Sequence, residues 1–145
     1  PTAQANTALG VLALQSGQRD QAINHFALAA NTDSPAGRQS LVMLTRLDLP
    51  EHPERYIQIG AQRDHNGYLA LSATNRSPLP VQDVEVQVEV YQPDGRLATR
   101  TPTRFPRTIP SGETVYAPTR IGPFPSVDRL ANAVRIHITS ARVAD

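Results

Sequence analysis

Prolines divide this sequence into two parts with different folding options. Of its 13 prolines, eleven lie at or after Pro50, and Pro35 is the sole proline between residues 2 and 49. Proline lacks a backbone N–H and fixes φ, so it is excluded from helix interiors but tolerated in turns and at strand edges. We therefore predict a helical segment over residues 1–50 and a β-sandwich domain over residues 51–145.

Apolar residues recur at helical spacing in three stretches of the first segment: 3–14, 19–30 and 36–47. Ser16-Gly17 interrupts the pattern after the first stretch, as expected at the end of a helix. Ser34 is a favourable N-cap and Pro35 suits the first helical position of the third stretch. Pro50 then ends that helix. The sequence thus predicts two helices joined by a tight turn, followed by a closing helix.

The first two helices carry the pattern of one tetratricopeptide repeat, in Gly10, Gly17, Ala22, Phe26 and Ala29. Gly10 and Ala22 are small where the helices would cross, and Phe26 would face the next helix. The large aromatic residue usual in the first helix is missing. We interpret the segment as one degenerate repeat, with an unrelated helical hairpin as the alternative. One such repeat cannot bury its own apolar stripe, so we expect further repeats upstream or packing on the downstream part of the chain.

After Pro53 the apolar pattern changes to the two-residue period of β-strands. In residues 84–90 four valines alternate with three polar residues, as a sheet with one wet face requires. Asn66-Gly67 and Gln92-Pro93-Asp94-Gly95 are strong turn signals. Other extended stretches are 56–61, 67–75, 96–103, 114–121 and 134–138, with a short helical turn at 128–132. Short strands with such punctuation predict an antiparallel immunoglobulin-like sandwich, so the fold class is α+β.

The composition argues against several classes of partner. With 14 basic and 13 acidic residues the net charge is +1, which provides no general attraction for nucleic acid or an anionic membrane. No apolar run approaches the roughly 18 residues of a membrane span. Cysteine is absent, which excludes disulfides and thiolate chemistry. We expect no nucleic-acid partner and no membrane span.

The sequence contains no recognisable catalytic or metal-binding constellation. No two of its four histidines lie within ten residues of each other, and the zinc motif His-Glu-x-x-His is absent. Glu85 and Glu89 form a carboxylate pair on the wet side of a predicted strand, a pairing that glycosidases use. A solvated strand face is the simpler interpretation. We predict no cofactor, no metal and no enzymatic activity for this chain.

A group of arginines is the one concentration of charge. Arg96, Arg100 and Arg104 have the same parity, so a regular strand would place them on one face. Such a face suits bidentate contacts to a carboxylate or phosphate. The alternative, which we favour, is pairing with Glu85 and Glu89 across a hairpin.

A surface for a protein or peptide partner is therefore the main functional expectation. In stacked tetratricopeptide hairpins the first helix lines a concave binding face. In this sequence that face would present five residues: Gln4, Thr7, Val11, Leu14 and Gln15. The sandwich would also offer strand edges to an added peptide strand.

The order of these parts resembles the C-terminal accessory region of bacterial M48-family zinc metallopeptidases of the cell envelope. The repeat residues Gly10, Gly17, Ala22, Phe26 and Ala29 carry the resemblance, together with Leu47-Asp48-Leu49-Pro50, Asn75-Arg76-Ser77-Pro78-Leu79-Pro80-Val81 and Ala141-Arg142-Val143-Ala144. The sandwich is also similar to extracytoplasmic FxLYD-type domains, which share an Asn-containing strand end, a proline loop, an alternating valine strand and a glycine turn.

The resemblance implies a non-catalytic module of a larger protein. Because His-Glu-x-x-His is absent, no catalytic residue is carried over, and the chain would recruit partners or substrates or contact the rest of its own parent. The family also implies a periplasmic or envelope location in bacteria. The chain begins at Pro1 without a leader, so we expect it to be processed or taken from a longer protein. The alternative is a structural adaptor or assembly factor of the envelope, unrelated to proteolysis.

Overall fold

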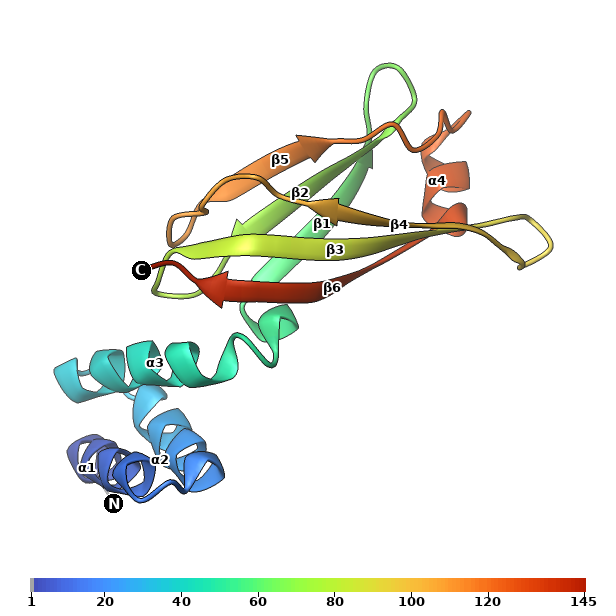
Figure 1. Cartoon of the computed structure of the whole chain (residues 1–145). Coiled ribbons are helices and arrows are strands. Elements are labelled where there is room, and N and C mark those ends of the chain that lie inside the picture. Colours follow the sequence, from blue (N-terminus) through green and yellow to red (C-terminus); the bar gives the residue numbers. More distant parts are fainter. Residues whose placement is uncertain (1) are drawn as a thin grey trace. The chain divides into compact units, whose positions relative to one another are not determined.

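The computed structural model describes residues 2–145, in which three helices precede two antiparallel sheets (Figure 1). The elements are α1 (Ala3–Gln15), α2 (Arg19–Ala30), α3 (Pro35–Asp48), η1 (Pro53–Arg55), β1 (Ile57–Arg63), β2 (Leu69–Asn75), β3 (Val81–Tyr91), β4 (Leu97–Arg104), β5 (Thr114–Pro118), α4 (Val127–Ala133) and β6 (Val134–Val143). The predicted α+β class is confirmed. The backbone divides between His52 and Pro53 into two compact units, two residues beyond the predicted boundary. We call them the helical unit and the sandwich unit and describe each by itself.

Side-chain caps fix where α1 and α3 of the helical unit begin, whereas α2 has no side-chain cap. Thr2 Oγ1 accepts a hydrogen bond from the Ala5 backbone nitrogen (3.1 Å), and Ser34 Oγ accepts one from that of Gly37 (3.0 Å). Pro35 occupies the first turn of α3, where its missing N–H leaves no hydrogen bond unmade. The predicted start of the third helix is therefore confirmed, and its predicted N-cap makes the capping bond.

The core of the helical unit is built around the ring of Phe26 on α2, which is completely buried. Ala13 and Ala22 pack beside it, and α3 adds Met43, Leu44 and Leu47. A Cβ atom on Gly10 would lie 2.5 Å from Phe26 Cε1, closer than carbon atoms can approach. Glycine at this position thus lets α1 approach the ring, which is the close helix crossing expected for Gly10. The tetratricopeptide assignment itself stays a prediction.

The sandwich unit consists of two three-stranded antiparallel sheets, ordered β1-β2-β5 and β4-β3-β6. Although β5 follows β4 in sequence, it pairs with β2 in the other sheet, so the chain crosses repeatedly between sheets. This connection is typical of Greek-key sandwiches. The strands β3 and β6 extend beyond the predicted alternating stretches because they pair with each other from Val81↔Val143 to Val90↔Val134.

The buried faces of the two sheets form the core of the sandwich unit. Alternate residues of β2 and β3 are buried, with polar residues between them on the outer side. The fully buried aliphatic side chains of these strands are Leu69, Leu71, Ala73, Val81, Val84, Val86 and Val88. Phe105 and Ile109, from the connection after β4, complete this core. The predicted valine strand therefore faces the interior as its alternation required.

The predicted Asn66-Gly67 turn lies in the connection between β1 and β2, where Gly67 has a positive φ of 90°. Strand pairing ends at Arg63↔Leu69, so five residues form the loop. One carboxylate oxygen of Asp64 accepts hydrogen bonds from the backbone nitrogens of Asn66 (2.8 Å) and Tyr68 (2.9 Å). Asp64 thus organises a wider turn by bonding to its own backbone neighbours.

The loop after β2 is held by the buried side chain of Asn75. Its Nδ2 donates to the carbonyl oxygens of Leu79 (2.7 Å) and Ile109 (2.9 Å), and its Oδ1 accepts from the Ser77 nitrogen (2.9 Å). Asn75 therefore joins the end of β2, the proline loop and the segment before β5. This gives a structural role to the first residue of the Asn-Arg-Ser-Pro-Leu-Pro motif.

Candidate functional site

The five residues predicted as a partner surface on α1 do not form one open face. Thr7 is buried, and its hydroxyl lies 2.6 Å from that of Ser40 on α3. Val11 packs against the cluster around Phe26. Gln4, Leu14 and Gln15 are exposed, Leu14 to 37%. Because α3 packs beside this side of α1, Thr7 and Val11 contact other residues of the helical unit. We therefore no longer include these two residues in the predicted partner surface.

Gln4 and Thr7 do border a hollow near the beginnings of α1 and α3. The hollow has a volume of about 670 Å³ and is also lined by Thr32, Ala36 and Gln39. These residues are uncharged, and the Thr7 hydroxyl is within 2.8 Å of the Ala3 carbonyl oxygen, to which it donates. The hollow offers shape but no charged group to orient a ligand.

A second side of α1 carries an uncovered row of apolar residues, which are among those whose helical spacing predicted this helix. We call Ala5, Ala8, Leu9 and Leu12 the α1 outer stripe. All four are exposed, Leu9 to 40% and Leu12 to 58%. Their spacing of i, i+3, i+4 and i+7 places them on one side of the helix, next to the side that buries Asn6, Gly10 and Ala13.

The apolar row of a surface helix normally faces the core, whereas the α1 outer stripe is exposed. The apolar residues that identify this helix in the sequence are mostly on its open side, whereas the buried side includes polar Asn6 and Thr7. Helices that are apolar all round are normally enclosed on every side. The signal available in the sequence was the lack of a polar side in residues 3–15, where no charged residue occurs.

The three predicted anion-binding arginines already face carboxylates, each at a different place. Arg100 Nη2 lies 2.9 Å from Glu89 Oε2 on the outer face of sheet β4-β3-β6, and Arg104 Nη2 lies 3.4 Å from Asp83 Oδ1. Arg96 is in the β3–β4 turn, with its Nε 3.6 Å from Asp94 Oδ2. The favoured expectation of cross-strand pairing thus holds for Glu89 and Arg100. The three arginines do not share one open anion site.

A β-bulge explains why Arg104 pairs with Asp83 rather than with Glu85, its partner in strand register. The register of β3 and β6 shifts between Gln82 and Glu85, and Asp83 has a positive φ of 54°. The irregular backbone re-aims the Asp83 side chain, as bulges do. Asp83 also accepts a hydrogen bond from Arg142 Nε on β6.

Glu89 is a largely buried carboxylate of the sandwich unit that faces both Arg100 and His137. Its side chain is only 13% exposed, and its Oε1 lies 3.9 Å from His137 Nδ1 across the sheet. Hydrogen bonds from Arg100 lower the pKa of the Glu89 carboxyl below its ordinary value, because they favour the charged form; desolvation opposes this effect. Glu89 therefore serves as the centre of a charge cluster on the outer sheet face.

Replacing Glu89 by glutamine should change how stability depends on pH. Since the folded pKa lies below the ordinary value of about 4.3, the charge of Glu89 stabilises the fold above that pH, and this contribution disappears as pH falls through the folded pKa. The stability gap between the parent and Glu89→Gln should therefore narrow on acidification from about pH 7 to about pH 3. Urea unfolding of both proteins at several pH values between these limits measures the difference in their free energies of unfolding. Glu113→Gln, at an exposed loop carboxylate, is the matched control, and a Glu89→Gln gap independent of pH would contradict the assignment.

The described residues offer neither a metal site nor a membrane-spanning helix. Among residues 2–145, no three histidine, aspartate or glutamate side chains come together in a group that could hold a metal ion. Over the same residues, each helix is too short or too polar to cross a bilayer.

Comparison with known proteins assigns the chain to no family. No family model matches it, and no curated protein sequence does. Among solved structures, cj0090 of Campylobacter jejuni is similar at 24% identity over 57% of this chain and 82% of that chain, with a TM-score of 0.30. A DUF1425 family member from Shewanella is similar at 17% identity over 61% of this chain and 79% of that chain, with a TM-score of 0.29.

TM-scores of this size do not define a shared fold, so neither structure assigns a function to this chain. None of the comparisons links it to zinc metallopeptidases. That resemblance therefore stays an interpretation of the sequence.

Proposed function

We propose that this chain is a non-catalytic protein-interaction module whose α1 outer stripe is covered by a partner. The observation that carries the proposal is the exposure of Leu9 and Leu12 in a row of apolar residues on α1. Exposed leucines are ordinary when scattered, but a contiguous apolar row indicates a contact surface. The partner acts by covering this row, without any chemical step.

The chemistry of the α1 outer stripe favours an apolar helix face as its occupant. Residues 2–18 contain no charged side chain, so the surroundings of the stripe neither attract nor repel a charged partner. Its small residues, Ala5 and Ala8, precede the larger Leu9 and Leu12 along the helix. Such a row offers ridges and grooves to a second helix, the usual mode of helix packing.

The parent that we propose is a larger zinc metallopeptidase of the bacterial periplasm or cell envelope, of which this chain is the accessory region. This part rests on the sequence resemblance carried by the repeat residues, the segment 75–81 and the ending 141–144. The occupant of the stripe would then be the preceding part of the same chain or a recruited protein.

A second candidate is a structural adaptor or assembly factor of the envelope. The α1 outer stripe supports it equally, since stacking of further helical hairpins needs no peptidase. The complete reading frame separates the two. A His-Glu-x-x-His motif in it supports the metallopeptidase parent, and additional helical repeats without that motif support the adaptor.

The proposal is tested by the accessibility of position 12 in two settings. Because the sequence has no cysteine, Leu12→Cys would carry the sole thiol of the isolated chain. We expect a maleimide to label it freely there and slowly in the complete protein, where the partner covers the stripe. Asn24→Cys, at an exposed position of α2, is the matched control and should be labelled equally well in both.

A further inference from the structure

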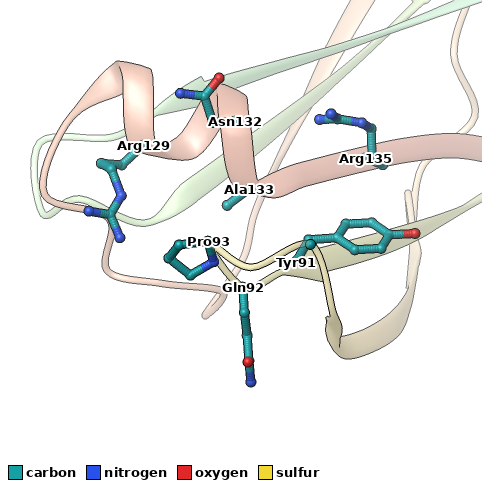
Figure 2. Close-up of a pocket in the computed structure, with 8 residues that line it drawn as sticks. Tyr91, Gln92, Pro93, Arg129, Asn132, Ala133 and Arg135 are labelled. Atoms are coloured by element: carbon teal, nitrogen blue, oxygen red, sulfur yellow. The ribbon is translucent and has the colours of Figure 1, made fainter.

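One end of the sandwich unit contains an open cleft that the proposed function does not use. It has a volume of about 650 Å³ and lies between the β3–β4 turn and the junction of α4 with β6. Figure 2 shows Tyr91 and Pro93 on the turn side and Arg129, Asn132 and Arg135 on the helix side. Clefts of this size are typical of ligand sites.

The lining of the cleft is basic, and Glu89, which lies opposite Arg135 in the register of β3 and β6, already pairs with Arg100. Its lining contains the guanidinium groups of Arg129 and Arg135, and none of the described residues that line it is acidic. Arg135 Nη1 is anchored by the carbonyl oxygens of Val134 (3.1 Å) and Ala131 (3.4 Å), neither of which neutralises its charge. The carboxylate of the nearby Asp94 faces its own loop, where its Oδ1 accepts a hydrogen bond from the Arg96 backbone nitrogen (2.9 Å).

Both walls of the cleft are held in place by packing and hydrogen bonds within the protein itself. Leu130 of α4 is buried, which directs its neighbours Arg129 and Asn132 away from the core, whereas Ala133 is half-buried. In the opposite wall the Gln92 nitrogen donates to the Arg96 carbonyl oxygen (2.8 Å), and the Gly95 nitrogen donates to that of Gln92 (2.9 Å). A site with preformed walls loses little freedom when it binds.

We propose that this cleft binds an acidic peptide segment. The two arginines match carboxylates, because the guanidinium group presents paired donors. Tyr91 and Pro93 provide apolar contact on the opposite wall. This combination favours a peptide over a free phosphate. The site is on the sandwich unit and does not depend on the α1 outer stripe.

Fluorescence anisotropy with the whole chain tests the proposal. The probes are a short labelled peptide of alternating Glu and Ser, and the same peptide with Gln in place of Glu. We expect the acidic peptide to bind and the Gln peptide not to bind. Arg129→Gln and Arg135→Gln should each weaken the affinity for the acidic peptide about tenfold, since each removes a charged hydrogen-bond donor. Arg107→Gln, at an exposed loop position, is the control and should bind as the parent does.

Backbone NMR shifts locate the bound peptide independently of affinity. Binding should move the signals of residues 91–95 and 129–135, and added salt should weaken it. Equal binding of the Gln peptide, equal loss with Arg107→Gln, or shifts confined to other strands would overturn the proposal. Inorganic phosphate that binds as tightly as the peptide, with shifts at the same residues, would also overturn it in favour of a phosphate site.

Discussion

Replacing Phe26 by alanine is expected to unfold the helical unit. The ring is completely buried and contacts residues from α1, α2 and α3, so its removal leaves a cavity that no neighbour can fill. Such truncations cost about 3–5 kcal/mol. A unit of this length is stable by only about 3–8 kcal/mol, at the usual stability per residue. Circular dichroism during urea unfolding of the whole chain measures the loss of helix.

The matched control for this prediction is Leu28→Ala, on the same helix but 58% exposed. Its free energy of unfolding should stay within about 0.5 kcal/mol of the parent. Because Phe26 belongs to the helical unit, the β-sheet signal of Phe26→Ala should persist while the helix signal falls. Full helix content in Phe26→Ala, with a cost below about 1 kcal/mol, would show that the ring is not the centre of this core.

Replacing Asn75 by alanine should be the most damaging polar substitution in the sandwich unit. It removes three hydrogen bonds and leaves the buried Ser77 N–H without its acceptor. An orphaned buried donor alone costs about 1–3 kcal/mol, so we expect a total loss of about 2–4 kcal/mol. The urea midpoint should fall with little change in the slope of the transition.

Asn66→Ala, in the exposed β1–β2 loop, is the control for Asn75→Ala. It removes an amide that lies on the surface and should change the free energy of unfolding by less than about 0.5 kcal/mol. If the two variants have equal midpoints, the Asn75 side chain does not hold the loop. The loop motif would then require another explanation.

Local patterns were sufficient to predict most of the elements. The Ser34-Pro35 cap and the alternating valines of β3 act through neighbouring residues and through the period of the strand, so they can be read directly from the sequence. The first three helices and the six strands were found in their order. The Asn66-Gly67 turn signal is also local, whereas the part that the Asp64 carboxylate plays in the loop was not predicted.

Features that depend on distant residues could not be predicted in the same way. A helix with apolar residues on both sides does not reveal which side will be covered, so the burial of Thr7 against Ser40 and the exposure of Leu12 are set only by the packing of α3. Likewise, the bulge at Asp83 changes the partner of Arg104 by a backbone irregularity that strand periodicity does not encode. The cleft at Arg129 and Arg135 requires the β3–β4 turn to meet α4.

The labelling rate of Leu12→Cys tests most directly whether the α1 outer stripe is a contact surface. If a partner covers the stripe, labelling in the complete protein must await local opening, and we expect it to be at least about tenfold slower than in the isolated chain. The rate of Asn24→Cys should be the same in both. Equal rates for Leu12→Cys in the two settings, with the control unchanged, would contradict the account.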